Sequence, residues 1–233
     1  MNIIRSVRPP CFRASILSRF TTHRMSSTAP KRIFPPLYSA TGNVGKDRLA
    51  FFHIIERLKT QKRTGWVQHK IPEPESIADH MYRMAVLAMC CEDATLDIAK
   101  CVMLAVVHDL AEAQVGDIAP SEGFSKSEKN RLEAEAMENF VQEMLHESEV
   151  GLRIQALWME YEEGKTPEAR FVKDLDRMEM ALQATEYEKR YDRDLQEFID
   201  SSIPKLQHPE VKQWGDALME ERQARSTENP SSS

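Results

Sequence analysis

The stretch Cys101-Val102-Met103-Leu104-Ala105-Val106-Val107-His108-Asp109-Leu110-Ala111-Glu112 changes abruptly from apolar to polar. Its apolar half predicts a buried helix, and a histidine beside an aspartate at the end of such a helix is costly unless something charged neutralises the pair. On a helix Glu112 lies four residues after His108 and three after Asp109, so the three side chains project toward one region. Imidazole nitrogens and carboxylate oxygens together are ligands for a divalent transition metal. A salt-bridged helix end is the simpler explanation of the pair taken alone.

The rest of the chain predicts an all-α fold. Apolar residues recur at helical spacing, and no segment alternates in the way that a half-buried strand does. The first helix is expected from Asp47, with Leu49, Phe52, Ile55 and Leu58 as its apolar stripe. The remaining helices are expected over residues 77–91, 97–115, 125–144, 151–162, 166–182, 195–202 and 209–222.

Helix starts are marked by local signals. Ser76 with Asp79 and Ser125 with Glu128 have the spacing of capping boxes. Thr166 followed by proline combines a favoured N-cap residue with the residue favoured at the first helical position. These signals fix where three of the expected helices begin.

Charge divides the 233-residue chain into parts. Residues 1–46 carry eight Lys or Arg and no acidic residue, which leaves 23 basic against 37 acidic residues in the remainder. We therefore expect a disordered basic leader and linker over 1–46, one domain over 47–225 and a polar tail over 226–233. So acidic a body argues against nucleic-acid polymers as partners, because their phosphate backbone would be repelled.

The leader has two interpretations. Residues 1–24 are rich in Arg, Ser and Thr, as mitochondrial targeting peptides are, and a plain tail ahead of Met25 is the alternative, which would give a cytoplasmic protein. The longest apolar runs have about seven residues, against roughly 20 for a membrane-spanning helix, so we expect no membrane partner. Three of the four cysteines lie on apolar stretches, which is typical of reduced thiols in an intracellular protein.

Two further polar residues lie on other apolar helices. His80 stands among apolar residues of the second expected helix, and Asp176 directly follows Leu175. Each alone is more often a satisfied core or surface group than a ligand. Together with His108 and Asp109 they form the order His…His-Asp…Asp on three separate helices, which reduces the chance of coincidence.

That order resembles the signature of the HD-domain metal-dependent phosphohydrolases, and the resemblance spans about residues 47–222. Four further blocks are similar to those of the 5′-deoxynucleotidase branch of this family: Arg63-Thr64-Gly65-Trp66, Pro74-Glu75-Ser76-Ile77-Ala78-Asp79-His80-Met81-Tyr82-Arg83, Gly116-Asp117-Ile118-Ala119-Pro120 and Phe171-Val172-Lys173-Asp174-Leu175-Asp176. The resemblance implies a compact single-domain helical bundle with a central metal site, and commonly a homodimer.

The resemblance also implies ligands and catalytic groups. One divalent cation would be held by His80, His108, Asp109 and Asp176. Glu112, Asp117 and the carbonyl of Ile118 are implicated in cation binding as well, with a second site as one arrangement. Glu112 and Asp117 are in addition the expected catalytic groups that orient water or handle protons, and solvated helix-end carboxylates are the alternative. Mn, Co and Mg are the leading candidates for the cation, and Fe, Ni and Zn stay open.

On the substrate side we expect Arg63 to grip a phosphate and Trp66 to offer a flat surface to sugar or base. In bacterial relatives an arginine immediately precedes this tryptophan, whereas Gly65 occupies that place here. Trp66 as an anchor of its loop on the core is an equal alternative. Arg83, three residues after His80, either contacts phosphate or pairs with a carboxylate.

The function expected from the resemblance is that of a metal-dependent 5′-deoxynucleotidase, which converts deoxyribonucleoside 5′-monophosphates to deoxynucleoside and phosphate. Another HD-type phosphohydrolase, such as a phosphodiesterase or a nucleoside polyphosphate hydrolase, is an alternative, although no glycine-rich phosphate loop is present. A non-catalytic metal-binding helical scaffold is a further alternative. The presence of Glu112 and Asp117 counts against that scaffold.

Overall fold

The computed structural model describes residues 32–228, and every regular element in that range is a helix. The predicted all-α class is therefore confirmed. An isolated antiparallel bridge joins Lys62 to Ser76 within the same range. None of the described helices combines the length and the apolar character that a membrane span requires. The proposed targeting segment over 1–24 lies outside the described residues.

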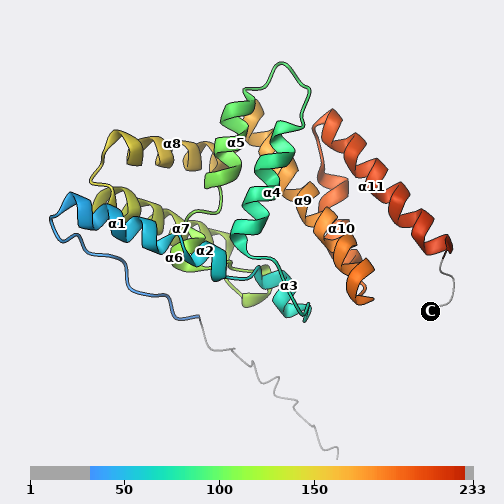
Figure 1. Ribbon diagram of the computed structural model, residues 1–233, viewed down its shortest axis with the longest axis horizontal. Helices are drawn as coiled ribbons and strands as arrows, with labels where there is room; N and C mark the ends of the chain where they lie inside the picture. The colour runs from blue at the N-terminus through green and yellow to red at the C-terminus, as the bar shows by residue number, and fades with distance from the viewer. Residues whose placement is uncertain (1–31, 229–233) are drawn as a thin grey trace, which may run out of the picture. The chain divides into compact units, whose positions relative to one another are not determined.

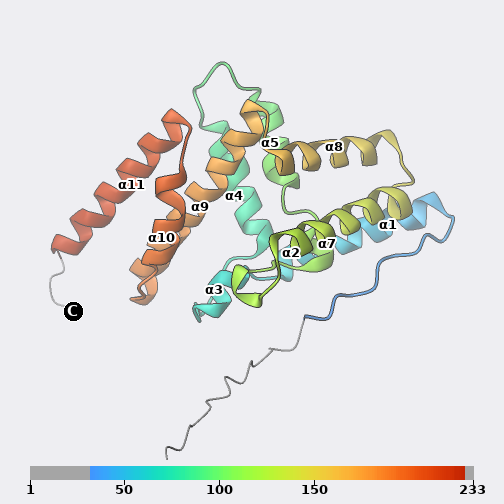
Figure 2. The same ribbon diagram turned by 180° about the vertical axis from the view of Figure 1, so that it is seen from behind.

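The helices occupy two sides of a central group (Figures 1 and 2). Helices α4, α5 and α9 lie together in the centre, α1, α7 and α8 lie on one side of them, and α10 and α11 on the other. The elements are α1 (Val44–Ile54), α2 (Arg57–Thr60), α3 (Thr64–Gln68), α4 (Ile77–Met89), α5 (Ile98–Val107), α6 (Glu112–Val115), the 3-10 helix η1 (Pro120–Glu122), α7 (Lys126–Asn139), the π-helix η2 (Phe140–Met144), α8 (Glu149–Glu163), α9 (Pro167–Tyr191), α10 (Gln196–Ser202), the 3-10 helix η3 (Ile203–Lys205) and α11 (Pro209–Glu228).

The predicted helix starts are present. The Asp79 amide donates to Ser76 Oγ at 3.1 Å while Asp79 Oδ2 accepts from the Ser76 amide at 2.8 Å, so the capping box of α4 is formed in both directions. The same reciprocal pair opens α7. At α9, Thr166 Oγ1 accepts from the Ala169 amide at 3.2 Å. These short-range signals place the ends of the helices that carry the site.

The helix predicted over residues 97–115 is interrupted. Helix α5 ends at Val107 and α6 starts at Glu112. Between them the backbone tightens into turns, with the Leu110 amide donating to the Val107 carbonyl at 3.1 Å and the Glu112 amide donating to the Asp109 carbonyl at 3.0 Å. His108 and Asp109 therefore lie on a turn rather than inside a continuous helix.

The apolar stripe predicted for the first helix was wrong in part: Leu58 is buried and Ile55 packs against the core, whereas the other two residues face solvent. Leu49 and Phe52 are 51% and 54% exposed. A strict three-residue step drifts away from the helical period of about 3.6 residues, so such a stripe turns off the core. The buried positions follow a four-three-four spacing instead: Asp47, Phe51, Ile54 and Leu58.

The segment ahead of α1 is held against the body, although it was expected to be a disordered linker. Gln114 Nε2 donates to the Pro35 carbonyl at 2.7 Å, and Asn139 Nδ2 donates to the Tyr38 carbonyl at 2.8 Å. The buried Asp47 carboxylate accepts from the Tyr38 and Thr41 hydroxyls, each at 2.7 Å. At the other end α11 runs to residue 228, beyond the predicted domain end at 225. The predicted domain scheme otherwise stays a prediction.

Two hydrophobic clusters meet along α4. Ile77 and Met81 belong to the cluster shared with α1, α7 and α8, whereas Met84 belongs to the cluster shared with α5, α9 and α11. His80 lies between these two sets of residues on α4. Leu104 and Leu110 are divided between the same clusters, so His108 also lies at their boundary. The fold therefore places both predicted histidines where the two clusters join.

Candidate metal centre

Three parts of the chain converge on one point: α4 brings His80, the turn after α5 brings His108 and Asp109, and α9 brings Asp176. His80 Nε2 lies 3.3 Å from Asp176 Oδ1 and 3.9 Å from Asp109 Oδ2. His108 Nε2 lies 3.0 Å from Asp109 Oδ2. One ligand atom each from His80, His108 and Asp176 lies within 4.8 Å of the others. The four side chains predicted from separate helices are thus brought together.

The two imidazoles present unpaired nitrogens to this point. His80 is fully buried and His108 is 4% exposed, yet neither Nε2 has a hydrogen-bond partner. The other nitrogens are engaged: His80 Nδ1 lies 2.5 Å from Glu179 Oε2, and His108 Nδ1 lies 2.9 Å from the Ala105 carbonyl. A neutral imidazole that donates from Nδ1 offers a lone pair on Nε2. Because unpaired buried nitrogens are costly, these residues fit a bound divalent cation.

The charges around the centre keep it anionic. Desolvation would raise the pKa of Asp109, but the neighbouring His108, His80 and Arg63 lower it well below its ordinary range. Burial and the nearby Arg63 would lower the pKa of His80, yet Glu179 and Asp176 raise it to about 10. These carboxylates therefore favour a positive charge at the centre, which a divalent cation bound there would supply.

A cavity of about 370 Å³ opens onto this centre. Asp109 and Asp176 line it, together with the substrate-side candidate Arg63. Arg63 Nη1 lies 3.7 Å from Asp109 Oδ2, and Arg63 Nε lies 3.6 Å from Glu75 Oε1. The guanidinium thus lies in the wall of the cavity beside the predicted ligands, where it can meet an anion.

Glu112, Asp117 and Ile118 also line the cavity. Glu112 is 2% exposed, its Oε2 has no partner, and burial together with the charges of Asp109 and Asp117 raises its pKa well above the ordinary value. Asp117 Oδ2 accepts from the Thr64 amide at 2.6 Å, which fixes one of its oxygens. Their roles in proton transfer and in binding a second cation stay predictions.

Trp66 is too deeply buried to offer a stacking surface to the sugar or base of a substrate. It is 1% exposed, its Nε1 donates to Glu75 Oε1 at 2.8 Å, and its ring packs against Phe198 with 4.3 Å between ring centroids. This burial fits the alternative interpretation, in which the tryptophan anchors its loop on the core. The better exposed apolar wall of the cavity comes from Phe198 and Met180.

Comparison with known proteins bears on this arrangement of two histidines and two aspartates. A family model described as the HD domain matches residues 55–213. This chain belongs to the HD-domain family. The matched residues include every predicted ligand.

The alignments of this HD-domain chain with curated relatives cover most of the length of each relative. It is 46% identical over 189 residues to 5′-deoxynucleotidase HDDC2 of Xenopus laevis, covering 80% of this chain and 93% of the relative. It is 47% identical over 177 residues to 5′-deoxynucleotidase hdd1 of Schizosaccharomyces pombe, with coverage of 74% and 89%. The human 5′-deoxynucleotidase HDDC2 is 45% identical over 184 residues, with coverage of 78% and 89%.

Solved structures share the fold. HD domain-containing protein YGK1 superposes with a TM-score of 0.58 at 34% identity, covering 76% of this chain and 86% of that one. The PH0347 protein from Pyrococcus horikoshii OT3 superposes with a TM-score of 0.60 at 30% identity, covering 75% and 97%. The helical arrangement is therefore that of other HD-domain proteins.

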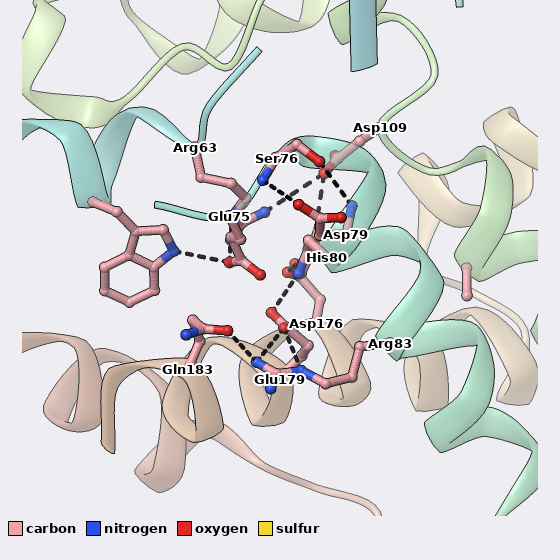
Figure 3. Close-up of polar contacts among 12 residues, drawn as sticks. Arg63, Glu75, Ser76, Asp79, His80, Arg83, Asp109, Asp176, Glu179 and Gln183 are labelled. Carbon is pink, nitrogen blue, oxygen red and sulfur yellow. Dashed lines mark hydrogen bonds and ion pairs between the residues drawn. The ribbon is translucent and has the colours of Figure 1, made fainter. Parts of the chain in front are cut away.

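A carboxylate behind the HD-domain residues was missed by the sequence analysis. Glu179 is fully buried on α9 one turn after Asp176, and it accepts from His80 Nδ1 and from Arg83 Nε, the latter at 2.8 Å (Figure 3). A carboxylate that holds the second nitrogen of a histidine fixes its tautomer and ring orientation. In the sequence, the only sign of this role for Glu179 is its position directly after the core residue Met178. Arg83 accordingly pairs with carboxylates, which was one of its two interpretations.

Tyr161 of α8 is a second missed neighbour. Its hydroxyl donates to Asp176 Oδ2 at 3.2 Å, and its ring lies 4.9 Å from that of His108 between centroids. The hydroxyl engages one carboxylate oxygen and leaves Oδ1 facing His80. Nothing in the sequence distinguishes this tyrosine from an ordinary core aromatic residue.

Proposed function

We propose that this HD-domain protein is a metal-dependent 5′-deoxynucleotidase, which hydrolyses deoxyribonucleoside 5′-monophosphates to deoxynucleosides and inorganic phosphate. The observation that carries the proposal is the pair of unpaired Nε2 atoms that face Asp109 and Asp176 beneath a cavity holding Arg63. Relatives that match over about nine tenths of their length and are named 5′-deoxynucleotidases support the assignment of substrate.

His80, His108, Asp109 and Asp176 would hold the cation. Mn²⁺, Co²⁺ and Mg²⁺ are the leading candidates for this set of two nitrogens and two carboxylates, and Fe²⁺, Ni²⁺ and Zn²⁺ are further candidates. A divalent cation bound here lowers the pKa of water and offsets the charge of the phosphate.

The protein's own groups supply the rest of the reaction. Arg63 donates to the phosphate oxygens through a charge-assisted fork. Water adds to phosphorus, the ester bond to the 5′ oxygen breaks, and that oxygen leaves with a proton as the hydroxyl of the deoxynucleoside. Glu112 lines the cavity and its Oε2 has no hydrogen-bond partner, which suits this carboxylate to take the proton of the attacking water. Asp117, on the same wall, orients that water.

The size and lining of the cavity support a small substrate. A volume of about 370 Å³ lies near the lower end of ligand pockets, which span about 300–1,000 Å³. Phe198 and Met180 give the sugar and base an apolar wall. A mononucleotide suits these dimensions better than a polymer, in keeping with the acidic body.

The homodimer is part of the same proposal. Tyr82, Val86 and Met89 are 72%, 37% and 60% exposed, and they recur along one face of α4. Met103 and Val106 on the neighbouring α5 are 43% and 48% exposed. A second copy would cover this apolar surface. Light scattering should give twice the monomer mass for the wild type, and Tyr82→Glu should reduce the measured mass to that of the monomer.

Localisation is proposed from the leader alone: cytoplasmic, or mitochondrial if residues 1–24 act as a transit peptide. Fusion of these residues to a fluorescent reporter decides between the two. A diffuse signal would remove the mitochondrial alternative.

The activity is tested by a matrix of purified protein, cations and nucleotides, with released phosphate as the readout. Deoxyribonucleoside 5′-monophosphates should be hydrolysed, and Asp109→Ala should abolish release while Asp216→Ala, at an exposed position on α11, leaves it unchanged. Turnover confined to cyclic or polyphosphate substrates would favour another phosphohydrolase. Cation binding with no turnover of any substrate would favour a scaffold.

A further inference from the structure

A lysine from a different part of the fold reaches the same cavity. Lys129 lies in the first turn of α7, and its Nζ lies 3.4 Å from Glu112 Oε1 and 3.4 Å from Glu133 Oε1. Among the described residues that line the cavity, Lys129 and Arg63 are the cationic ones. No sequence signal marks this lysine, which lies in a polar helix start and in none of the family blocks.

The two cations are held differently. The Arg63 side chain is 14% exposed and lies between Glu75 and Asp109, whereas that of Lys129 is 34% exposed. Hydrogen bonds from nitrogen to oxygen are most often about 2.9–3.0 Å long, so both contacts of Lys129 are long. An ammonium has three N–H donors. Lys129 therefore has at least one donor to spare, and its greater exposure gives the side chain room to change partner.

The charge of the cavity calls for a second cation beside Arg63. Four carboxylates line it: Asp109, Glu112, Asp117 and Asp176. A divalent cation and Arg63 together offset three of these charges, and a phosphate monoester then adds about two more at neutral pH.

We propose that Lys129 binds the phosphate of the substrate, its ammonium moving from Glu112 to a phosphate oxygen and leaving Glu112 Oε1 free beside the reacting atoms. This assignment rests on the proposed 5′-nucleotidase function and adds a phosphate ligand to it. Arg63 holds the phosphate from beside Asp109, and Lys129 holds it from α7.

The test compares Lys129→Ala with the wild type on a deoxyribonucleoside 5′-monophosphate. The KM should rise about 10- to 100-fold, as the loss of a hydrogen bond to a charged group implies, while kcat changes less. Lys129→Arg should recover part of this loss because it keeps the charge. Lys126→Ala, at an exposed position in the same turn, should leave both constants unchanged. Thermal melting and Mn²⁺ titration of each variant show whether the fold and the cation site are intact.

Binding of inorganic phosphate to the Mn²⁺-loaded protein, followed by calorimetry, separates this proposal from the function on which it rests. Lys129→Ala should weaken phosphate binding by a factor similar to the change in KM. Unchanged phosphate affinity in this variant, or no binding by the wild type, overturns the proposal, even if kcat falls through Glu112. If the wild type hydrolyses no nucleotide, the proposed function fails, and the phosphate titration still decides whether Lys129 binds this anion.

Discussion

Replacing Glu179 by glutamine should weaken cation binding without removing any proposed ligand. Glu179 Oε2 lies 2.5 Å from His80 Nδ1, while Oε1 accepts from Arg83 Nε at 2.8 Å. Burial would raise the pKa of this carboxyl, but the charges of His80, Arg83 and Arg63 hold it well below its ordinary range, so the native group is ionised. Glutamine keeps the shape and one acceptor oxygen and loses the charge that makes His80 a stronger ligand.

Changing a residue that supports a ligand typically costs about 10- to 100-fold in metal affinity, which corresponds to about 1.4–2.8 kcal/mol. Breaking a buried ion pair by removing one partner costs about 3–5 kcal/mol of stability. The Arg83 side chain is 28% exposed, so water and Glu186 compensate part of that loss. We therefore expect Glu179→Gln to lower the free energy of unfolding by about 1–3 kcal/mol.

The assay is titration of the purified variants with Mn²⁺, followed by calorimetry, with urea denaturation of the same samples. Glu186→Gln is the matched control, because Glu186 Oε2 also accepts from Arg83 at 2.8 Å but is 51% exposed and has no contact with His80. Glu186→Gln should bind Mn²⁺ with wild-type affinity. Wild-type affinity in Glu179→Gln as well would show that Glu179 only neutralises Arg83, and the argument from His80 would be refuted.

Three further predictions concern neighbouring groups. Tyr161→Phe removes the donor to Asp176, so Mn²⁺ affinity measured by calorimetry should fall about two- to tenfold, and an unchanged value would assign the hydroxyl no part in positioning. Burial raises the pKa of Glu133 to about 7. Between pH of about 4.3 and 7 the folded state therefore binds more protons than the unfolded state, and stability measured in urea should fall with rising pH by up to about 3 kcal/mol more in the wild type than in Glu133→Gln. Gly116→Ala should cost about 1–3 kcal/mol and lower the Tm, because φ is +74° and an added Cβ would lie 2.8 Å from Arg32 Nη1; a wild-type Tm would contradict this.

Short-range signals predicted the helices that carry the site. Ser76 and Ser125 form the capping boxes that their spacing indicates. A repeat of three residues misplaces part of the buried face of the first helix, and a fully buried carboxylate, Asp47, occupies one of its core positions. Burial of a charged group depends on partners such as Tyr38 and His146, which spacing along one helix does not reveal.

The part of the site that could be predicted is the part that residue type and order along the chain reveal. His80 and Asp176 were found because each interrupts an apolar helix. Glu179 was not, because its contact with His80 joins residues 99 apart and depends on how α4 packs against α9. Trp66 was assigned to the substrate by resemblance, and only its 1% exposure shows how little of the ring is open to a ligand.

Both histidines stand on the boundary between the two hydrophobic clusters. A cation bound there would crosslink the two hydrophobic clusters, because its ligands come from helices that pack in both of them. A relative shift of about an ångström between the two clusters would separate the cation ligands, although each cluster would keep its own packing. Cation occupancy would then depend on intact packing between the two clusters. Removal of the cation by a chelator should destabilise the contact between the clusters before it destabilises either cluster.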